Sequence, residues 1–513
     1  MRSATLITGD IGVVSVQIAL VSSFTAAFLG VDAIGDGMAL IVAGGTARLV
    51  YSEADLNAAM SLSLGSVPAP GSGYVSSQSL SAPIAIGNLD PGRSIAFQAA
   101  GSLVRAFLFD SHSGALTSSV LDSAGQPGAA TTVSSNIGAL KGIETFAVMG
   151  GATGDCAVLS KWNTAGLQVF HLNANGSLTL TDTVHDTVKS HVGNVSDTAS
   201  VTVGGQNYLL SLSSLENGIT SYTIDGNDKA SLVDSLGTHD LLAVSGPAAL
   251  QVMQVAGLTY AVIAATGSSS LSVVRVNDMG CLFQTDHVVD DLTTRFAHTA
   301  VLDSFTLNGR SFVVTAGTDA GITIMELLPG GKLSHFATGA FEVGLGLAAV
   351  TGLEVAVNGT TASIFVVDAH ADLVQRFEVS LANLGGVIQA VGGSATGTSK
   401  DDLLLGSAAT ETLSGWGGDD MIFSGGGADV MTGGAGADRF VFAASSDNLR
   451  ITDFELHSDR IDLSDWGHVY SKAALTITAT ATGAVISLNG HDVTLVAGQS
   501  LSAASFLDSD FLF

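Results

Sequence analysis

The sequence predicts an all-β protein in which two kinds of internal repeat follow one another. Three observations lead to this prediction. The 513 residues include 62 glycines but only 7 prolines, and Val, Ile, Thr and Ser are plentiful, which is typical of β-strands joined by many turns. Apolar, β-branched segments recur along residues 1–393, and a shorter glycine-rich repeat occupies residues 397–441. A chain of this length is sufficient for two or three domains.

The longer repeat predicts a seven-bladed β-propeller over residues 1–393. Its seven copies are ALIVAGG (39–45), IAFQAAG (95–101), CAVLSKW (156–162), YLLSLSS (208–214), YAVIAAT (260–266), FVVTAGT (312–318) and IFVVDAH (364–370). The last four spacings are 52 residues each, the first two are 56 and 61, and another strand-like segment follows most copies after a short polar loop. Blocks of four short strands at about 50 residues are typical of propeller blades.

The two ends of such a ring are expected to meet in one blade. Residues 15–21 alternate between apolar and polar side chains, the two-residue period of a strand, and we expect them to complete the blade formed by residues 352–393. The pattern loosely resembles lactonase-type and YVTN-type propellers in strand rhythm, without a specific shared motif. A two-sheet sandwich and repeated immunoglobulin-like modules are the alternative interpretations.

The shorter repeat consists of five nine-residue units in one unbroken frame: GTSKDDLLL, GSAATETLS, GWGGDDMIF, SGGGADVMT and GGAGADRFV. Each unit has an acid at its sixth position and an apolar residue at its eighth. The acids are Asp402, Glu411, Asp420, Asp429 and Asp438, and the apolar residues are Leu404, Leu413, Ile422, Met431 and Phe440. A flexible Gly/Ser/Asp linker, the alternative interpretation, would not repeat an apolar residue at this interval.

The last unit matches Gly-Gly-x-Gly-x-Asp-x-apolar-x, and units of this kind resemble the RTX, or haemolysin-type, calcium-binding repeats, which stack into a parallel β-roll. The resemblance implies a roll over residues 394–445 with Ca²⁺ as its cofactor. Glycines allow the backbone to turn with positive φ and to point carbonyl oxygens inward, and the sixth-position carboxylate adds a hard anionic ligand. The glycines assigned to these turns are Gly415, Gly417, Gly425, Gly427, Gly433, Gly434 and Gly436.

The acids that share an ion follow from the spacing. Because a roll changes side every nine residues, turns stacked on one side are eighteen residues apart. This pairs Asp402 with Asp420, Glu411 with Asp429, and Asp420 with Asp438, and it predicts up to three sandwiched ions. The middle pair is the weakest candidate, because GSAATETLS lacks two inner glycines and carries Glu in place of Asp.

Residues 446–513 are expected to form a β-strand cap on the roll. Residues 438–463 closely resemble the segment that follows the repeats in serralysin-type secreted proteases, where strands continue and cap the roll. Three acids of this segment, Asp453, Asp459 and Asp462, are further candidate calcium ligands. Asp453 is the best placed of them, whereas Asp459 is better interpreted as a solvated turn acid.

Charge and targeting signals restrict the partners and the location. Acidic residues outnumber basic ones by 46 to 18, which disfavours nucleic acid and anionic membranes as partners and favours divalent cations.

Residues 11–31 carry no charge, but their alternating polarity predicts a strand and not a membrane span or signal peptide. The ending DSDFLF resembles the uncleaved export signals of RTX proteins, which implies a type I secretion apparatus as partner and an extracellular location. The two cysteines, Cys156 and Cys281, predict free, buried thiols.

The favoured function is a non-enzymatic, secreted, calcium-loaded protein that folds on export. Its propeller would serve as an extracellular binding, adhesion or surface-matrix platform, with a glycan or a cell-surface molecule as partner. No His-Glu-x-x-His motif, Gly-x-Ser-x-Gly elbow, phosphate loop or dinucleotide fingerprint occurs.

The alternative function is a lactonase-like secreted hydrolase with a His/Asp site on one face of the ring. The connections between blades would supply His185, Asp186, His191, His239, Asp240, Asp290, Asp291, Arg295 and His298. The loops between second and third strands would supply Lys161, Trp162, Glu216, Asp319, His370 and Asp372. Polar loops in any propeller hold polar residues, so this face remains a hypothesis.

Overall fold

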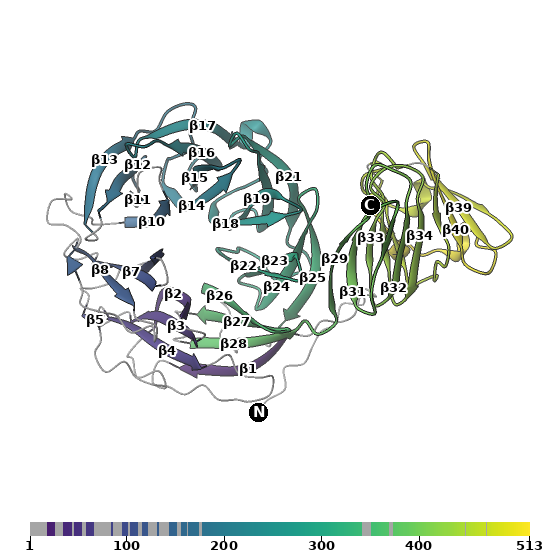
Figure 1. The fold of residues 1–513 in the computed structure, drawn as a ribbon, viewed down its shortest axis with the longest axis horizontal. Coiled ribbons are helices and arrows are strands. Elements are labelled where there is room, and N and C mark those ends of the chain that lie inside the picture. Colours follow the sequence, from purple (N-terminus) through teal and green to yellow (C-terminus); the bar gives the residue numbers. More distant parts are fainter. Residues whose placement is uncertain are drawn as a thin grey trace. The chain divides into compact units, whose positions relative to one another are not determined.

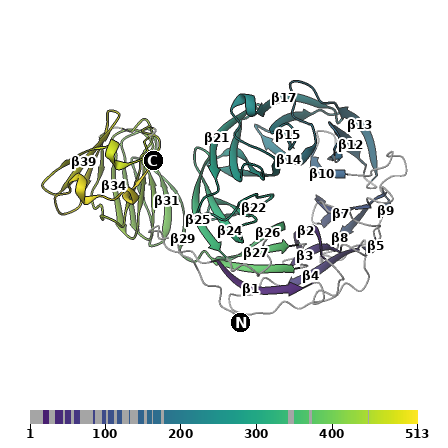
Figure 2. The same ribbon diagram turned by 180° about the vertical axis from the view of Figure 1, so that it is seen from behind.

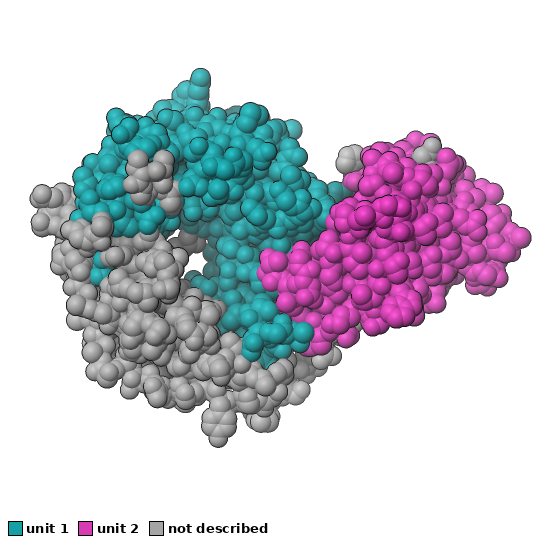
Figure 3. All heavy atoms as spheres, in the orientation of Figure 1, with its two compact units in different colours: residues 1–7, 17–305, 311–379 teal, residues 8–16, 306–310, 380–513 magenta. Residues whose placement is uncertain are grey.

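The computed structural model describes residues 155–513 apart from 162, 174–176, 341–349, 369–372, 447 and 468, and it describes only the strands of residues 1–154. The described chain forms two compact units, coloured separately in Figure 3. The first comprises residues 18–305 and 311–379, and the second comprises residues 306–310 and 380–513. The two units are described separately below.

The first unit is a ring of seven four-stranded sheets, which Figures 1 and 2 show from its two sides. The all-β class and the propeller architecture are therefore confirmed. Six blades take four consecutive strands each, and neighbouring strands run antiparallel, as β14 to β17 show. The strands of these six blades are β2 (Ile34–Ala43), β3 (Thr46–Glu53), β4 (Ala58–Gly65), β5 (Ile84–Ala85), β6 (Ile95–Ala100), β7 (Leu103–Asp110), β8 (Ala115–Leu121), β9 (Thr131–Thr132), β10 (Ile143–Gly150), β11 (Asp155–Lys161), β12 (Leu167–Leu172), β13 (Leu178–Val184), β14 (Val195–Val203), β15 (Gln206–Ser213), β16 (Gly218–Ile224), β17 (Ala230–Gly237), β18 (Pro247–Val255), β19 (Leu258–Ala265), β20 (Ser270–Val276), β21 (Leu282–Val289), β22 (Val301–Leu307), β23 (Arg310–Ala316), β24 (Gly321–Leu328) and β25 (Lys332–Ala340). A short 3₁₀ helix, η1 (Thr238–Asp240), follows β17.

The seventh blade joins the two ends of the ring. It contains β26 (Val350–Asn358), β27 (Thr361–Asp368), β28 (Leu373–Ser380) and, as its outer strand, β1 (Ile18–Thr25). β1 pairs antiparallel with β28, with Ile18 opposite Val379. The predicted closing strand is confirmed at its described positions, although residues 15–17 lie outside the described part of the chain.

The predicted repeat has a shifted register in its first two copies. In five blades the recurring segment lies on the second strand (β11, β15, β19, β23 and β27), whereas 39–45 overlaps the first strand β2 and 95–101 overlaps the first strand β6. The equivalent second strands there are β3 and β7. The spacing of 61 residues arises where the recurring segment changes from a first strand to a second strand, since both kinds of strand have the same apolar, β-branched pattern. The spacing of 56 residues separates two first strands.

The inner strands of the blades form the core, and acids join neighbouring blades. Every residue of β23 and β24 is buried. On the outer strands, three acids spaced 52 residues apart each accept a backbone N–H from the following blade. These bonds run from Ala230, Leu282 and Leu333 to Oδ2 of Asp182, Asp234 and Asp286 at 2.9, 2.9 and 2.7 Å. Part of the negative charge of the chain therefore serves to join neighbouring blades.

The second unit is a β-roll built from two sheets whose repeat strands run parallel. The first sheet contains β29 (Leu384–Gln389), β31 (Asp401–Leu405), β33 (Met421–Phe423), β35 (Arg439–Val441), β37 (Arg460–Asp462) and β41 (Phe511–Leu512). The second contains β30 (Ser394–Thr396), β32 (Thr412–Gly417), β34 (Val430–Ala435), β36 (Leu449–Ile451), β40 (His491–Val496), β39 (Gly483–Leu488) and β38 (Thr476–Ala479). Three 3₁₀ helices, η2 (Lys472–Ala474), η3 (Ala503–Ser505) and η4 (Asp508–Asp510), lie in the connections.

Stacking in the roll follows the eighteen-residue period. Leu404 pairs with Ile422, and Ile422 pairs with Phe440, while Leu413 pairs with Met431 on the other sheet. All five eighth-position side chains are fully buried and belong to one hydrophobic cluster. The apolar residue of each unit therefore holds the coils together.

The roll extends beyond the repeats at both ends. β29 pairs parallel with β31, although it lies before the predicted start of the roll at residue 394. On the other side, β36, β37, β40 and β41 continue the two sheets in parallel through the segment predicted as a cap. At the edge of the second sheet, β38 pairs antiparallel with β39, and β39 pairs antiparallel with β40. Flanking coils cover the apolar residues that the first and last repeats would otherwise expose.

Two smaller predictions concern thiols and membranes. Cys156 and Cys281 are both free; Cys156 is buried, as predicted, but Cys281 is only half-buried. Burial raises the pKa of the Cys156 thiol to about 12. Among the described residues, no helix has the length and apolar character needed to cross a membrane.

Candidate metal centre

The sixth-position acids of the roll are buried. Asp402, Glu411, Asp420, Asp429 and Asp438 are each between 0 and 4% exposed, which is unusual for carboxylates. The cause is the strand period: positions six and eight point to the same face, so burial of the apolar eighth residue draws the acid inward. Packing between coils therefore places these carboxylates where water does not reach them.

One oxygen of each stacked acid is held by a backbone N–H of the coil before it. The N–H groups of Asp402, Glu411, Asp420 and Asp438 donate to Oδ1 of Asp420, Asp429, Asp438 and Asp459 at 2.8, 2.8, 2.9 and 3.0 Å. The three predicted pairs are thus neighbours in the roll, and the ladder continues one coil beyond the repeats. These bonds fix the orientation of each carboxylate.

In the three glycine-rich units the second carboxylate oxygen has no hydrogen-bond partner among the residues that the structure describes. Oδ2 of Asp420, Asp429 and Asp438 is buried without any hydrogen bond. Burial raises the pKa of Asp420 to about 8, of Asp438 to about 7 and of Asp429 to about 6. An unpaired buried oxygen is costly, and a bound cation is one way to satisfy it.

In the first two units, by contrast, both oxygens have donors. Asp402 accepts from Gly386 N and from the N and Oγ1 of Thr398, at 2.8, 2.6 and 2.7 Å. Glu411 accepts from Ser407 N at 2.9 Å through Oε2 and from the Ser407 hydroxyl through Oε1. The middle pair was already the weakest candidate, whereas the capping of Asp402 corresponds to Thr398 at the second position, where the last unit has Gly.

A turn glycine lies against two of the free oxygens, those of Asp420 and Asp438. A Cβ on Gly415 would lie 2.1 Å from Asp420 Oδ2 and 2.5 Å from the carbonyl oxygen of Gly433. A Cβ on Gly433 would likewise lie 2.1 Å from Asp438 Oδ2. Carboxylate and carbonyl oxygens thus converge where a side chain is missing, and hard oxygen donors are what Ca²⁺ requires. The residues present fit the ion.

The remaining predicted glycines serve in two ways. Gly425, Gly427, Gly434 and Gly436 have φ of +70°, +91°, +107° and +139° at the second and fourth positions of their units. Gly417, at a third position, has neither positive φ nor a close neighbour, since its Cβ would meet only Ala435 O at 3.7 Å. Trp416, which the pattern did not single out, occupies a second position with φ +79° and an exposed side chain.

The acids after the repeats differ from their predicted roles in part. Asp453 accepts N–H bonds from Gly433 and Gly434 at 3.0 and 2.9 Å and so caps the last glycine-rich turn. Asp459 was predicted to be solvated, but it is 1% exposed, and burial raises its pKa to about 7. The error arises because the ladder continues past the motif. Asp462 pairs with Arg439 at 2.5 Å.

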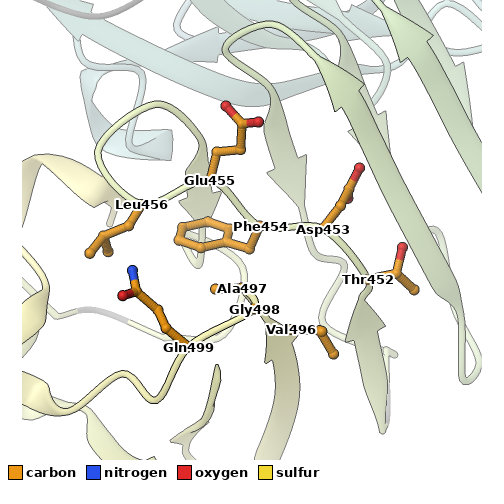
Figure 4. A pocket seen from close by; sticks show the side chains of 9 residues that line it. All are labelled: Thr452, Asp453, Phe454, Glu455, Leu456, Val496, Ala497, Gly498 and Gln499. Atoms are coloured by element: carbon orange, nitrogen blue, oxygen red, sulfur yellow. The ribbon is translucent and has the colours of Figure 1, made fainter. Parts of the chain in front are cut away.

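Beside Asp453 the roll has a pocket of about 380 Å³. Figure 4 shows Phe454 between Asp453 and Glu455 on one segment, with Gln499 on the segment that faces it. Phe454 is buried, whereas Glu455 and Gln499 are exposed. The pocket therefore has an aromatic wall and a polar rim.

In the propeller, the two loop classes of the alternative hydrolase site meet at one end of the ring. Gly193 N donates to Glu216 at 2.7 Å, and Ala297 N donates to Asp319 at 3.3 Å. These carboxylates therefore accept hydrogen bonds from backbone N–H groups. Asp240, Asp290 and Asp291 likewise accept backbone N–H groups of their own loops. The ring of His191 packs on Gly218 and Gly237.

The other residues of that face are placed as follows. His185, Asp186 and His239 are exposed, Lys161 is half-buried, Arg295 lies 4.0 Å from Asp319, and His298 lies 3.3 Å from the Thr318 hydroxyl. Trp162, His370 and Asp372 lie outside the described residues. Within the described part of the chain, no group of three His, Cys, Asp or Glu side chains is arranged to hold a metal.

Stacked coils, buried carboxylates and glycine turns together define a calcium-binding β-roll. The family model described as RTX calcium-binding nonapeptide repeat, in four copies, matches residues 395–422, 405–440 and 417–449. The C-terminal region therefore carries RTX repeats, and repeats of this kind bind calcium.

Among solved structures, the chain is similar to a protein from Lactobacillus plantarum, with 15% identity, a TM-score of 0.46, and coverage of 66% of this chain and 95% of the other. It is also similar to a putative 6-phosphogluconolactonase from Bacteroides uniformis, with 15% identity, a TM-score of 0.42 and the same coverage of 66% and 95%. No curated protein matches the chain.

Proposed function

We propose that this is a secreted protein whose roll folds when it binds Ca²⁺ outside the cell. The observation that supports the proposal is the set of buried carboxylate oxygens without partners at Asp420, Asp429 and Asp438. Extracellular calcium near ~10⁻³ M reaches the dissociation constants of ~10⁻⁴–10⁻³ M that extracellular modules show. Because the ligands are assembled only in the folded roll, binding energy becomes folding energy.

In this proposal the calcium-poor cytosol leaves the roll open for export through a type I apparatus. Self-repulsion among buried acids opposes folding until a divalent ion neutralises them. The acids concerned lie eighteen residues apart, and each carboxylate accepts a hydrogen bond from the backbone N–H of the acid one coil earlier. Export would thus precede folding without any further signal.

Trp466 offers a direct test. It lies in the core of the roll, 3% exposed, with its ring centroid 5.1 Å from that of Phe442. In full-length protein with Trp162 and Trp416 changed to Phe, we expect the emission of Trp466 to shift to shorter wavelength on addition of Ca²⁺ to chelated protein, but not of an equal amount of Mg²⁺. A spectrum in chelator identical to that in calcium would contradict calcium-triggered folding.

We further propose that the propeller is a binding platform for a cell-surface or matrix molecule, a glycan included. Val188, Leu241 and Leu292 occupy corresponding connections between successive blades, and all three are more than 80% exposed. We take these three side chains as the contact points of the platform. The carboxylates Glu216 and Asp319 on that face are engaged with backbone, so we place binding ahead of hydrolysis.

This platform can be tested by changing the three aliphatic residues to Ser. We expect the triple variant to lose most of its adhesion to intact cells or extracellular matrix while its thermal unfolding stays unchanged. A matched control changes Leu180, Leu232 and Leu258, which are 41–52% exposed elsewhere, to Ser. Equal adhesion of both variants would remove this face from the proposal, and turnover of lactones or esters would favour the hydrolase.

A further inference from the structure

The five turns of the roll fall into two structural classes. In the three glycine-rich units, positions two and four have positive φ, as at Gly434 and Gly436. In the two leading units these positions hold Thr398 and Lys400, and Ser407 and Ala409, none of which has positive φ. The backbone of the leading turns therefore follows a different path, one that ordinary residues adopt without strain.

The class of the turn decides how its acid is satisfied. In each leading unit the second residue donates both its backbone N–H and its hydroxyl to the sixth-position carboxylate four residues later. Thr398 does so for Asp402, and Ser407 does so for Glu411. A carboxylate that receives several N–H and O–H bonds is stabilised as an anion without a metal.

In each glycine-rich unit the second residue has no hydroxyl to donate. The second positions are Trp416, Gly425 and Gly434, and the corresponding oxygens of Asp420, Asp429 and Asp438 are buried without a partner. In the two units with a hydroxyl at position two, both carboxylate oxygens have donors. In the three units without it, one carboxylate oxygen is free.

We infer that Thr398 and Ser407 take the place of calcium in the first two turns, so that the repeats hold ions only against Asp420, Asp429 and Asp438. This inference rests on the proposed calcium binding and restricts it. Of the three predicted pairs, only Asp420 and Asp438 both have a free oxygen, whereas Asp429 is stacked on the capped Glu411. The two leading turns therefore fold without metal, and their strands are in place for the next coil to pair with.

Counting bound ions in full-length variants tests this inference. We expect Asp420→Asn to lower the calcium bound per chain, measured by equilibrium dialysis and atomic absorption, by about one ion. We expect Asp402→Asn, a matched change one coil away, to leave the count unchanged while it lowers the thermal stability of the roll. A loss of calcium in Asp402→Asn equal to that in Asp420→Asn would overturn the inference.

Anomalous diffraction from unmodified protein crystallised with Ca²⁺ gives the same answer without any variant. The expected peaks lie beside Asp420, Asp429 and Asp438, and none lies beside Asp402 or Glu411. A peak in contact with Asp402 or Glu411 would overturn this inference but leave the proposed function standing. A roll without any calcium would overturn both.

Discussion

The propeller and the roll use the same residue type in opposite ways. In the propeller, Asp182, Asp234 and Asp286 accept backbone N–H groups from the next blade, so the protein itself satisfies them. In the roll, Asp420 and Asp438 keep one buried oxygen free, and that of Asp420 lies close to the carbonyl oxygen of Gly433. The chain has a net charge of −28, but this excess of acids does not say what each acid does. The groups around a carboxylate decide whether it joins two strands or binds a cation.

The strongest way to break this comparison is to remove calcium. We expect chelator to abolish the thermal transition of the roll and to leave that of the propeller within a few degrees of its position, because the stacked carboxylates Asp420, Asp429 and Asp438 lie in the roll. Differential scanning calorimetry, with limited proteolysis to locate the unfolded segment, checks this. Loss of both transitions together would show that the blades also depend on calcium.

The pH dependence of the calcium-free roll sharpens the contrast. The pKa values of Asp420, Asp438 and Asp429 are about 8, 7 and 6 in the fold, above the ordinary 3.8, so the folded roll binds protons more tightly than the unfolded chain. The contribution of these three acids to its stability is therefore greatest near pH 4 and falls as the pH rises towards 8, by up to about 1.4 kcal/mol per pH unit for each acid.

Denaturant unfolding in chelator at pH 5 and pH 8 measures this effect, which should reach several kcal/mol in total. Calcium affinity should change in the opposite sense over the same window, because Ca²⁺ must displace these protons. A calcium-free roll that is more stable at pH 8 than at pH 5 would contradict the predicted environment of the acids.

A methyl group in the glycine turns should separate crowded from open positions. Gly415→Ala places a Cβ against Asp420 Oδ2 and Gly433 O, and we expect calcium affinity to fall at least about tenfold, equivalent to ~1.4 kcal/mol. The control is Gly417→Ala in the same turn, where the nearest atom would be 3.7 Å away. Isothermal titration calorimetry of both variants decides; equal affinities would mean that ions bind elsewhere.

The smallest expected effect concerns the propeller acids. Asp234→Ala removes the 2.9 Å bond from Leu282 N, and we expect the propeller to lose about 1 kcal/mol of stability with no change in calcium binding. Asp186→Ala, at an exposed position on a neighbouring connection, is the control and should be neutral. A change in calcium affinity for Asp234→Ala would contradict the view that acids of the propeller join blades and do not bind calcium.

Much of the architecture could be predicted from local periodicity. The 52-residue recurrence indicated seven blades, and alternating polarity around Ile18 indicated the closing strand that pairs with β28. The nine-residue frame indicated that Leu404, Ile422 and Phe440 stack, and with them their acids. Such patterns are legible because burial imposes a fixed period on the residues that face a core.

Other features depended on which groups meet in space. The sequence did not indicate that β29 belongs to the roll or that Asp459 lies in its interior, because both lie outside the nonapeptide motif although the same coil period continues through them. Nor did the motif distinguish Asp402, capped by Thr398, from Asp420, whose second oxygen is free. By itself the sequence determined where acids and glycines recur. Only the tertiary structure decided which acids keep an unsatisfied oxygen, because hydrogen bonds form according to the direction of each donor, and that direction is set by the path of the folded backbone.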